Sequence, residues 1–176
     1  MMWRADKTII HPEEFNPGKN FQCGSYTIID DDVQIGDNVR IGCFVRLKEG
    51  TIIGDNVWID DYSVSSGECI IEDNVVIRYK SIIARNVRVR SGAYISPMVS
   101  TAYLDHSTVQ SVVPLVIGSE AFIGTGVIIL PRGSIAKGVV VGAGSVVTKP
   151  LDKPFAIYHG IPAIFQRYLN SPEIRG

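Results

Sequence analysis

A repeat of six residues constrains this chain more than any other feature of its sequence. From Ile29 to Thr101 in steps of six, eleven of the thirteen positions are Ile, Leu or Val. An amphipathic helix would repeat its apolar face about every 3.6 residues and a half-buried strand every second residue, so neither fits as a long element. The repeat instead predicts short strands separated by turns, with the large aliphatic side chains pointing inward.

Two further positions within each hexad support this interpretation. Four residues after each large aliphatic stands a smaller residue, such as Val45 or Ala93, that is neither bulky nor charged. Three residues after it often stands Asn or Gly, as at Asn38, Gly50, Asn56, Asn74, Asn86 and Gly92. These residue types adopt left-handed backbone conformations at the lowest cost, so we expect the chain to turn a corner there.

A slower repeat of eighteen residues indicates how many hexads make one coil. Similar tripeptides recur at that interval, namely Gly36-Asp37-Asn38, Gly54-Asp55-Asn56 and Glu72-Asp73-Asn74. Three hexads therefore form one triangular coil, stacked on the next at about the 4.8 Å spacing of paired strands. The prediction is an all-β chain folded as a parallel β-helix with three hexapeptides per coil.

The repeat is interrupted once. It stops after Thr101 and resumes at Ile117, and because sixteen is not a multiple of six, the chain must leave the prism between them. We therefore expect an excursion loop over residues 101–116. Insertions of this kind often carry the functional site, and this one contains His106.

The flanking segments lack the six-residue repeat. Residues 1–22 contain Pro12 and Pro17, and we expect them to cap one end of a β-helix that spans residues 23–150. A short C-terminal segment, residues 151–176, should pack back on the last coil.

Composition excludes several classes of protein. A formal charge of −1 argues against a general nucleic-acid binder, and 45% hydrophobic with 20% charged residues argues against disorder. No apolar run approaches the roughly eighteen residues of a membrane span, and no signal peptide is evident, so we expect a cytoplasmic protein. Three cysteines without CxxC spacing and three scattered histidines predict neither a disulfide framework nor a metal site.

The segment leading into the excursion loop resembles a known family. Ile95-Ser96-Pro97-Met98-Val99 followed by His106 is similar to hexapeptide-repeat acyltransferases, and closest to galactoside and xenobiotic O-acetyltransferases. The resemblance implies left-handed coils and His106 as general base, since imidazole can accept a proton near neutral pH. Asp105 would orient the imidazole or merely form a turn. Tyr103 would line the acceptor pocket or plug the base of the loop.

Further segments resemble the acetyl-coenzyme A site of the same family. They are Phe122-Ile123-Gly124-Thr125, Val141-Gly142-Ala143-Gly144-Ser145-Val146-Val147-Thr148-Lys149 and Gly160-Ile161-Pro162-Ala163. By resemblance, Phe122 supports the site, Thr125 bonds the pantetheine arm, Ala143 and Thr148 contact the arm or the adenosine, and Lys149 faces phosphate. Arg167 lies where the family places a basic residue near the nucleotide phosphate, although it could also be a solvated charge. His159 is interpreted as structural or as part of an adenine pocket.

Two observations bear on the acceptor. Val76 and Ala84 stand where galactoside-type enzymes hold the sugar with Asn and Asp, so the acceptor should be held differently here. A basic cluster precedes the loop and consists of Arg78, Lys80, Arg85, Arg88 and Arg90. It could meet a diphosphate on the acceptor, or it could form charge pairs between coils, in which Arg90 would stack on Glu72.

The resemblance implies transfer of acetyl from acetyl-coenzyme A to a hydroxyl of a sugar or similar small acceptor. Attack would be direct, because none of the three cysteines lies in a segment matched to the site. One alternative is N-acetylation of an amino sugar, free or nucleotide-linked, in surface-polysaccharide synthesis. Another is a non-catalytic binding or assembly module. The family also implies a homotrimer whose sites lie between neighbouring prisms.

Overall fold

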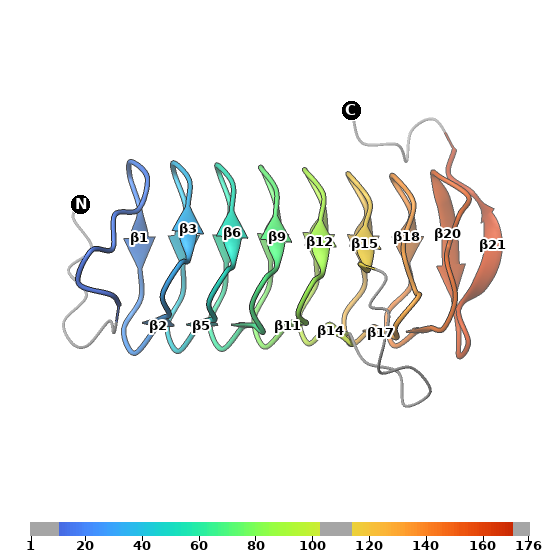
Figure 1. The fold of residues 1–176 in the computed structure, drawn as a ribbon. Coiled ribbons are helices and arrows are strands. Elements are labelled where there is room, and N and C mark those ends of the chain that lie inside the picture. Colours follow the sequence, from blue (N-terminus) through green and yellow to red (C-terminus); the bar gives the residue numbers. More distant parts are fainter. Residues whose placement is uncertain (1–10, 103–113, 171–176) are drawn as a thin grey trace.

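The computed structural model describes residues 11–102 and 114–170, and it confirms the predicted fold. The chain is a left-handed parallel β-helix, a three-sided prism whose coils stack along one axis (Figure 1). Most strands are only two residues long, as a six-residue repeat with intervening turns requires. Each side of the prism is one parallel sheet, except where the C-terminal strand pairs antiparallel.

The three sheets share the same register. The nine-stranded sheet contains, in order, β1 (Gln22–Cys23), β4 (Arg40–Ile41), β7 (Trp58–Ile59), β10 (Val76–Ile77), β13 (Tyr94–Ile95), β16 (Phe122–Ile123), β18 (Val140–Val141), β20 (Ala156–His159) and β21 (Ile164–Tyr168). The seven-stranded sheet contains β19 (Val146–Val147), β17 (Ile128–Ile129), β14 (Ser100–Thr101), β11 (Ile82–Ile83), β8 (Val64–Ser65), β5 (Arg46–Leu47) and β2 (Ile28–Ile29). The five-stranded sheet contains β15 (Val116–Ile117), β12 (Arg88–Val89), β9 (Ile70–Ile71), β6 (Ile52–Ile53) and β3 (Gln34–Ile35).

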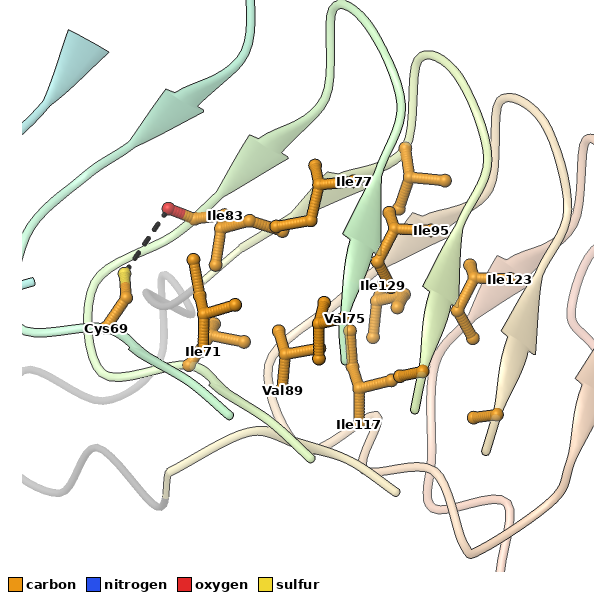
Figure 2. Close-up of a cluster of buried hydrophobic side chains, with 14 of the residues drawn as sticks. Cys69, Ile71, Val75, Ile77, Ile83, Val89, Ile95, Ile117, Ile123 and Ile129 are labelled. Carbon is orange, nitrogen blue, oxygen red and sulfur yellow. Dashed lines mark hydrogen bonds between the residues drawn. The ribbon is translucent and has the colours of Figure 1, made fainter. Parts of the chain in front are cut away.

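The large aliphatic residues of the repeat fill the axis of the prism. Ile71, Ile95 and Ile123 are at most 1% exposed, and Figure 2 shows such side chains gathered between the three walls. Each fully buried side chain of this size contributes about 1.5–3 kcal/mol of transfer free energy. Cys69 takes one of the smaller inward positions, and its thiol lies 3.6 Å from the carbonyl oxygen of Ile83.

Left-handed corner residues and stacked polar side chains hold the coils in register. Asn38, Asn56 and Asn74 have φ values of 57°, 56° and 59°, as the repeat predicted. Beside them, the amide of Asp37 donates to Oδ1 of Asp55 at 2.7 Å, and the amide of Asp55 donates to Oδ1 of Asp73 at 2.8 Å. Side-chain ladders of this kind satisfy backbone donors that the turn leaves unpaired.

The excursion lengthens one coil by ten residues. Strand β12 pairs with β15 so that Arg88 faces Val116, twenty-eight residues later, whereas coils elsewhere repeat after eighteen, as when Gln22 faces Arg40. The loop leaves after β14, in the seven-stranded sheet, and the chain re-enters the prism at β15, in the five-stranded sheet.

Both ends of the prism carry additional structure. At the C-terminal end, β20 pairs with β18 and β21 folds back on β20, as the sequence suggested for this segment (Figure 1). At the other end, the amide of Gly18 already donates to the carbonyl of Ile35 at 2.9 Å, and β1 begins at Gln22. The first coil therefore starts a few residues before position 23.

Candidate active site

The prism has three edges, and the residues expected to bind the coenzyme lie mainly on two of them. The first corner joins the nine-stranded to the seven-stranded sheet and includes residues 124–127 and 142–145. The turn 160–163, which connects β20 to β21, stacks on this corner through hydrogen bonds with Val146. The second corner joins the seven-stranded to the five-stranded sheet and includes residues 130–133 and 148–151. The seven-stranded sheet separates the two corners.

The first corner brings together two residues expected to contact the coenzyme. Thr125 and Ala143 occupy equivalent places on successive coils, and both side chains are exposed. The amide of Gly144 donates to the carbonyl of Thr125 at 2.8 Å, which fixes the spacing of the two coils. Gly160 lies on the same corner one coil further, where its carbonyl accepts from Val146 at 3.0 Å and its amide donates to Ser145 Oγ at 3.1 Å.

Glycines keep the outer surface of this corner bare. Gly126 and Gly144 have φ values of 69° and 68°, and a Cβ on either would meet nothing within 4 Å. Gly142 differs, because a Cβ added there would point along the axis toward the next coil and lie 2.8 Å from Cβ of His159. The first corner therefore exposes backbone and small side chains that a slender chain could approach closely.

Phe122 lies beside the first corner, on the outer face of the nine-stranded sheet. Its ring stacks on Tyr94 of the preceding coil, with centroids 5.2 Å apart and planes 3° apart. The stack packs the aromatic side chain against the wall, and a role for Phe122 in supporting a coenzyme site stays a prediction. An aromatic contact of this kind contributes about 0.5–1.5 kcal/mol beyond its buried area.

Thr148 and Lys149 lie on the second corner, not on the first. Both side chains are exposed, and the excursion loop leaves the prism at this same edge, after Thr101. Arg132, an exposed cation with a φ of 71°, lies on this corner one coil before Lys149. The sequence analysis did not identify Arg132, because this residue belongs to no motif. The one available signal was the repeat of eighteen residues, which puts Pro131, the neighbour of Arg132, at the same place as Lys149 one coil earlier.

Arg167 is remote from Lys149 in the fold. It lies in β21, where its Cα pairs with Ile157 and its guanidinium donates to the carbonyl of Tyr168 at 3.1 Å. The exposed His159 lies in β20 directly above Gly142. These two residues cover the C-terminal end of the nine-stranded sheet.

The three residues expected from the excursion loop, Tyr103, Asp105 and His106, lie outside the described residues. Their roles as acceptor contact, orienting carboxylate and general base stay predictions. The structure does establish where the loop begins, which is at the second corner, the edge that carries Lys149.

The four arginines of the basic cluster form charge pairs between coils. Glu72 accepts from Arg88 at 2.9 Å and from Arg90 at 3.1 Å, so the expected stacking of Arg90 on Glu72 is present. Arg85 pairs with Glu68 at 2.8 Å, and Arg78 pairs with Asp60 at 3.1 Å. These pairs favour the structural interpretation of the cluster over a diphosphate site.

The cysteines are free thiols, and two of them titrate above their ordinary range. Burial raises the pKa of the Cys23 thiol to about 11, against a smaller opposing effect of a hydrogen bond with Thr27. Burial also raises the pKa of Cys69. Both are therefore protonated at neutral pH and are poor nucleophiles.

Residues 11–102 and 114–170 contain neither a metal-binding cluster nor a membrane-spanning helix. Over these ranges, no group of three or more His, Cys, Asp or Glu side chains is placed to hold a metal ion. The same ranges contain no helix that is long and apolar enough to span a membrane.

Comparison with known proteins agrees with the fold. Residues 50–85 match the family model described as Bacterial transferase hexapeptide (six repeats). None of the curated proteins compared with this chain is a match.

Solved structures match a larger part of the chain. The acetyltransferase domain of PglB from Neisseria gonorrhoeae aligns with a TM-score of 0.60 at 19% identity, over 80% of this chain and 57% of that chain. The same domain in complex with acetyl coenzyme A gives a TM-score of 0.60 at 20% identity, over 80% and 57%. AntD, an N-acyltransferase from Bacillus cereus solved with dTDP and coenzyme A, gives 0.61 at 21% identity, over 88% and 86%. These likenesses establish a shared β-helical fold.

Proposed function

We propose that this protein transfers an acetyl group from acetyl-coenzyme A to a hydroxyl of a sugar or similar small acceptor. The observation that carries the proposal is the bare first corner, where Thr125 and Ala143 are exposed on successive coils between glycines with open space outside them. Small residues at such a place let a pantetheine arm lie against backbone amides and carbonyls. PglB and AntD, which share the fold, were solved with acetyl coenzyme A and coenzyme A respectively.

The chemistry assigned to the chain's own residues is general base catalysis. His106 removes the proton of the acceptor hydroxyl as the oxygen attacks the thioester carbonyl, and the coenzyme leaves as its thiol. A positioned base contributes about 10²- to 10⁴-fold in rate. Asp105 orients the imidazole and Tyr103 contacts the acceptor. Direct attack without an acyl-enzyme is consistent with the raised pKa of the Cys23 and Cys69 thiols.

The separation of the two corners leads to a composite site between subunits. Thr125 and Ala143 lie on the first corner, whereas Thr148 and Lys149 lie on the second, where the loop that contains His106 begins. If the seven-stranded sheets of three copies face a common threefold axis, the first corner of one copy lies against the second corner of the next. Lys149, with Arg132 beside it, would then meet the coenzyme phosphates held along the neighbouring wall.

The outer face of the seven-stranded sheet fits that arrangement. Its outward side chains include the aliphatics Val64, Ile82, Ile128 and Val146, and Ile82 and Ile128 are each 43% exposed. Ser100 lies between Ile82 and Ile128 on this face, and the face is otherwise aliphatic from Val64 to Val146. A largely apolar exposed surface of this kind is typical of one that packs against another chain. A homotrimer is therefore part of the proposal.

A second candidate is N-acetylation of an amino sugar, free or nucleotide-linked. It is favoured by AntD, an N-acyltransferase solved with dTDP and coenzyme A. The pairing of Arg78, Arg85, Arg88 and Arg90 with carboxylates removes the support that the basic cluster gave it.

The test is release of free thiol from acetyl-coenzyme A in the presence of matched hydroxyl and amino sugars. We expect release with the hydroxyl panel and its loss, by about 10²-fold or more, in His106→Ala. Release confined to amino sugars would favour the second candidate. No coenzyme binding by calorimetry, and no release with either panel, would favour a non-catalytic module.

A further inference from the structure

The N-terminal coils carry a groove that the proposed acetyl transfer does not use. It lies on the nine-stranded sheet beside the first corner, has a volume of about 280 Å³ and spans three coils. Its polar lining comes from Gln22, Arg40, Trp58, Asp60 and Asp61. A second hollow, of about 300 Å³, lies on the other side of Arg40 and Trp58, against the amide side chains of Asn20, Asn38 and Asn56.

Trp58 is fixed between these two hollows. The guanidinium carbons of Arg40 and Arg78 lie 5.0 Å and 5.5 Å from its ring centroid. Arg78 is itself held by Asp60, with which it pairs at 3.1 Å. The indole is nevertheless 40% exposed. A large aromatic held this firmly, with part of its surface left to solvent, is preorganised for contact with a ligand.

The polar groups in the groove alternate between donors and acceptors. Arg40 donates through Nε to Oε1 of Gln22 at 3.3 Å, and its remaining N–H groups are donors as well. Asp61 accepts the amide of Cys43 at 2.7 Å through one oxygen, and a carboxylate has a second oxygen for another donor. Arg40 and Asp61 line the groove with opposite charges. Asp60, which also lines it, is neutralised by its pair with Arg78, which lies outside the lining, so the four charges sum to zero.

That balance selects the class of ligand. A phosphate or carboxylate ligand would meet Asp61 and Asp60, and a cation would meet Arg40. A neutral polyhydroxyl compound meets neither penalty, because each hydroxyl can accept from a guanidinium and donate to a carboxylate. Next to the groove lining, the exposed rings of Tyr26, Phe44 and Tyr62 stack along the first corner with successive centroids 5.0 Å apart.

We infer that the groove over β1, β4 and β7, between Arg40, Trp58 and Asp61, binds a neutral saccharide. Its volume is near the lower end for small-molecule sites, which suits a short saccharide. Three strand spacings, about 14 Å, separate β7 from β16 with Phe122, so this site is distinct from the coenzyme wall. The inference does not depend on the proposed acetyl transfer.

The test uses the fluorescence of Trp58 in the full-length chain. The chain has two tryptophans, and Trp3→Phe leaves Trp58 as the only one. This variant is titrated with maltotriose, cellotriose, chitotriose and glucose 6-phosphate at low and high salt. Arg40→Gln removes the guanidinium from the groove. Arg88→Gln, at an outward strand position of the five-stranded sheet, is the matched control, and circular dichroism verifies that each variant is folded.

We expect at least one neutral trisaccharide to give a saturable, salt-insensitive change in emission. Arg40→Gln should weaken this binding about tenfold or more, and Arg88→Gln should leave it unchanged. The inference is overturned if no neutral saccharide gives a saturable change, or if Arg88→Gln weakens binding as much as Arg40→Gln. Preferential, salt-sensitive binding of glucose 6-phosphate would also overturn it, in favour of an anion site.

Discussion

The backbone amide of Gly144 donates to the carbonyl of Thr125 at 2.8 Å and so joins two successive coils at the first corner. This bond places the exposed side chains of Thr125 and Ala143 one above the other, at the spacing of paired strands. The proposed coenzyme wall is therefore built on backbone that the β-helix itself holds rigid. Sites on regular elements of this kind are positioned more accurately than sites on free loops.

A bulky side chain at the wall should block coenzyme binding without unfolding the protein. Ala143 is exposed, so Ala143→Trp fits the fold but covers the first corner. We expect at least a tenfold loss of coenzyme A affinity by calorimetry, with little change in melting temperature. Lys137→Trp, at the corresponding position of the third edge, is the control and should bind normally. Equal affinity in both variants contradicts the assignment of the wall.

The corner glycines should accept asparagine better than valine. Gly144 has a φ of 68°, close to the values of 57° and 56° that Asn38 and Asn56 adopt at other corners. Because a Cβ on Gly144 meets nothing within 4 Å, only the backbone conformation resists substitution. Gly144→Val should therefore be about 1–2 kcal/mol less stable than Gly144→Asn in chemical denaturation. Equal stability of the two variants would show that this backbone conformation is not maintained in solution.

Glu72 should stabilise the fold and have no role in acceptor binding. It accepts from Arg88, Arg90 and Ser91, and its side chain is only 21% exposed. We expect Glu72→Gln to lower the free energy of unfolding by about 1–3 kcal/mol. Glu120→Gln, which loses a more exposed pair with Lys137, should cost less than about 1 kcal/mol. If Arg90→Gln raises the acceptor KM without lowering stability, the cluster binds substrate after all.

Because of Asp60, the free energy of unfolding should decrease as the pH rises above the ordinary pKa of an aspartate. Burial raises the pKa of Asp60, and the opposing effect of Arg78 is smaller. The folded state thus holds the proton more tightly than the unfolded chain, so the contribution of Asp60 is fully present below the unfolded pKa, about 3.9. It is lost as pH rises through the higher folded pKa.

The measurement compares wild type with Asp60→Asn by chemical denaturation at a series of pH values. Asn does not titrate, so the stability of wild type relative to the variant should decrease from pH 3 upward, with the change centred above pH ~3.9. A relative stability that increases over the same range would mean that the pairing with Arg78 outweighs burial.

The cysteines should be dispensable for transfer. The raised pKa of Cys23, about 11, keeps its thiol protonated at neutral pH, and Cys69 is fully buried. A Cys23→Ser, Cys43→Ser double variant should keep its turnover rate within about threefold of wild type in the thiol-release assay. Isolation of an acetylated cysteine from wild type, or loss of turnover in the variant, contradicts direct attack.

Much of the fold could be predicted because the six-residue repeat determines which residues point inward and where the chain turns. A large aliphatic every six residues defines the axis, and Asn or Gly three residues later defines the corners, as Ile53 and Asn56 do. Both signals are local in the sequence, so they can be interpreted without knowledge of distant contacts. The stacking of Tyr94 on Phe122 could not be predicted in this way, because the excursion places them twenty-eight residues apart instead of eighteen.

The site was harder to predict because a motif does not say which edge of the prism it occupies. The segment from Val141 to Lys149 resembles one continuous coenzyme wall in sequence. Ala143 and Thr148 are five residues apart, however, and β19 intervenes, so the two side chains lie on different corners. The groove around Arg40 and Trp58 also left no motif, since it depends on how charges and a ring from separate coils stack.

Subunit complementation tests the composite site most directly. His106→Ala removes the proposed base from the loop that begins at the second corner, and Ala143→Trp blocks the wall on the first, so each variant alone should be inactive. After the two are mixed equally, dissociated and reassembled, a site that takes one corner from each of two copies has both intact parts about one time in four. We predict recovery of about a quarter of wild-type thiol release. No recovery, from variants that each reassemble into trimers, would contradict a site shared between subunits.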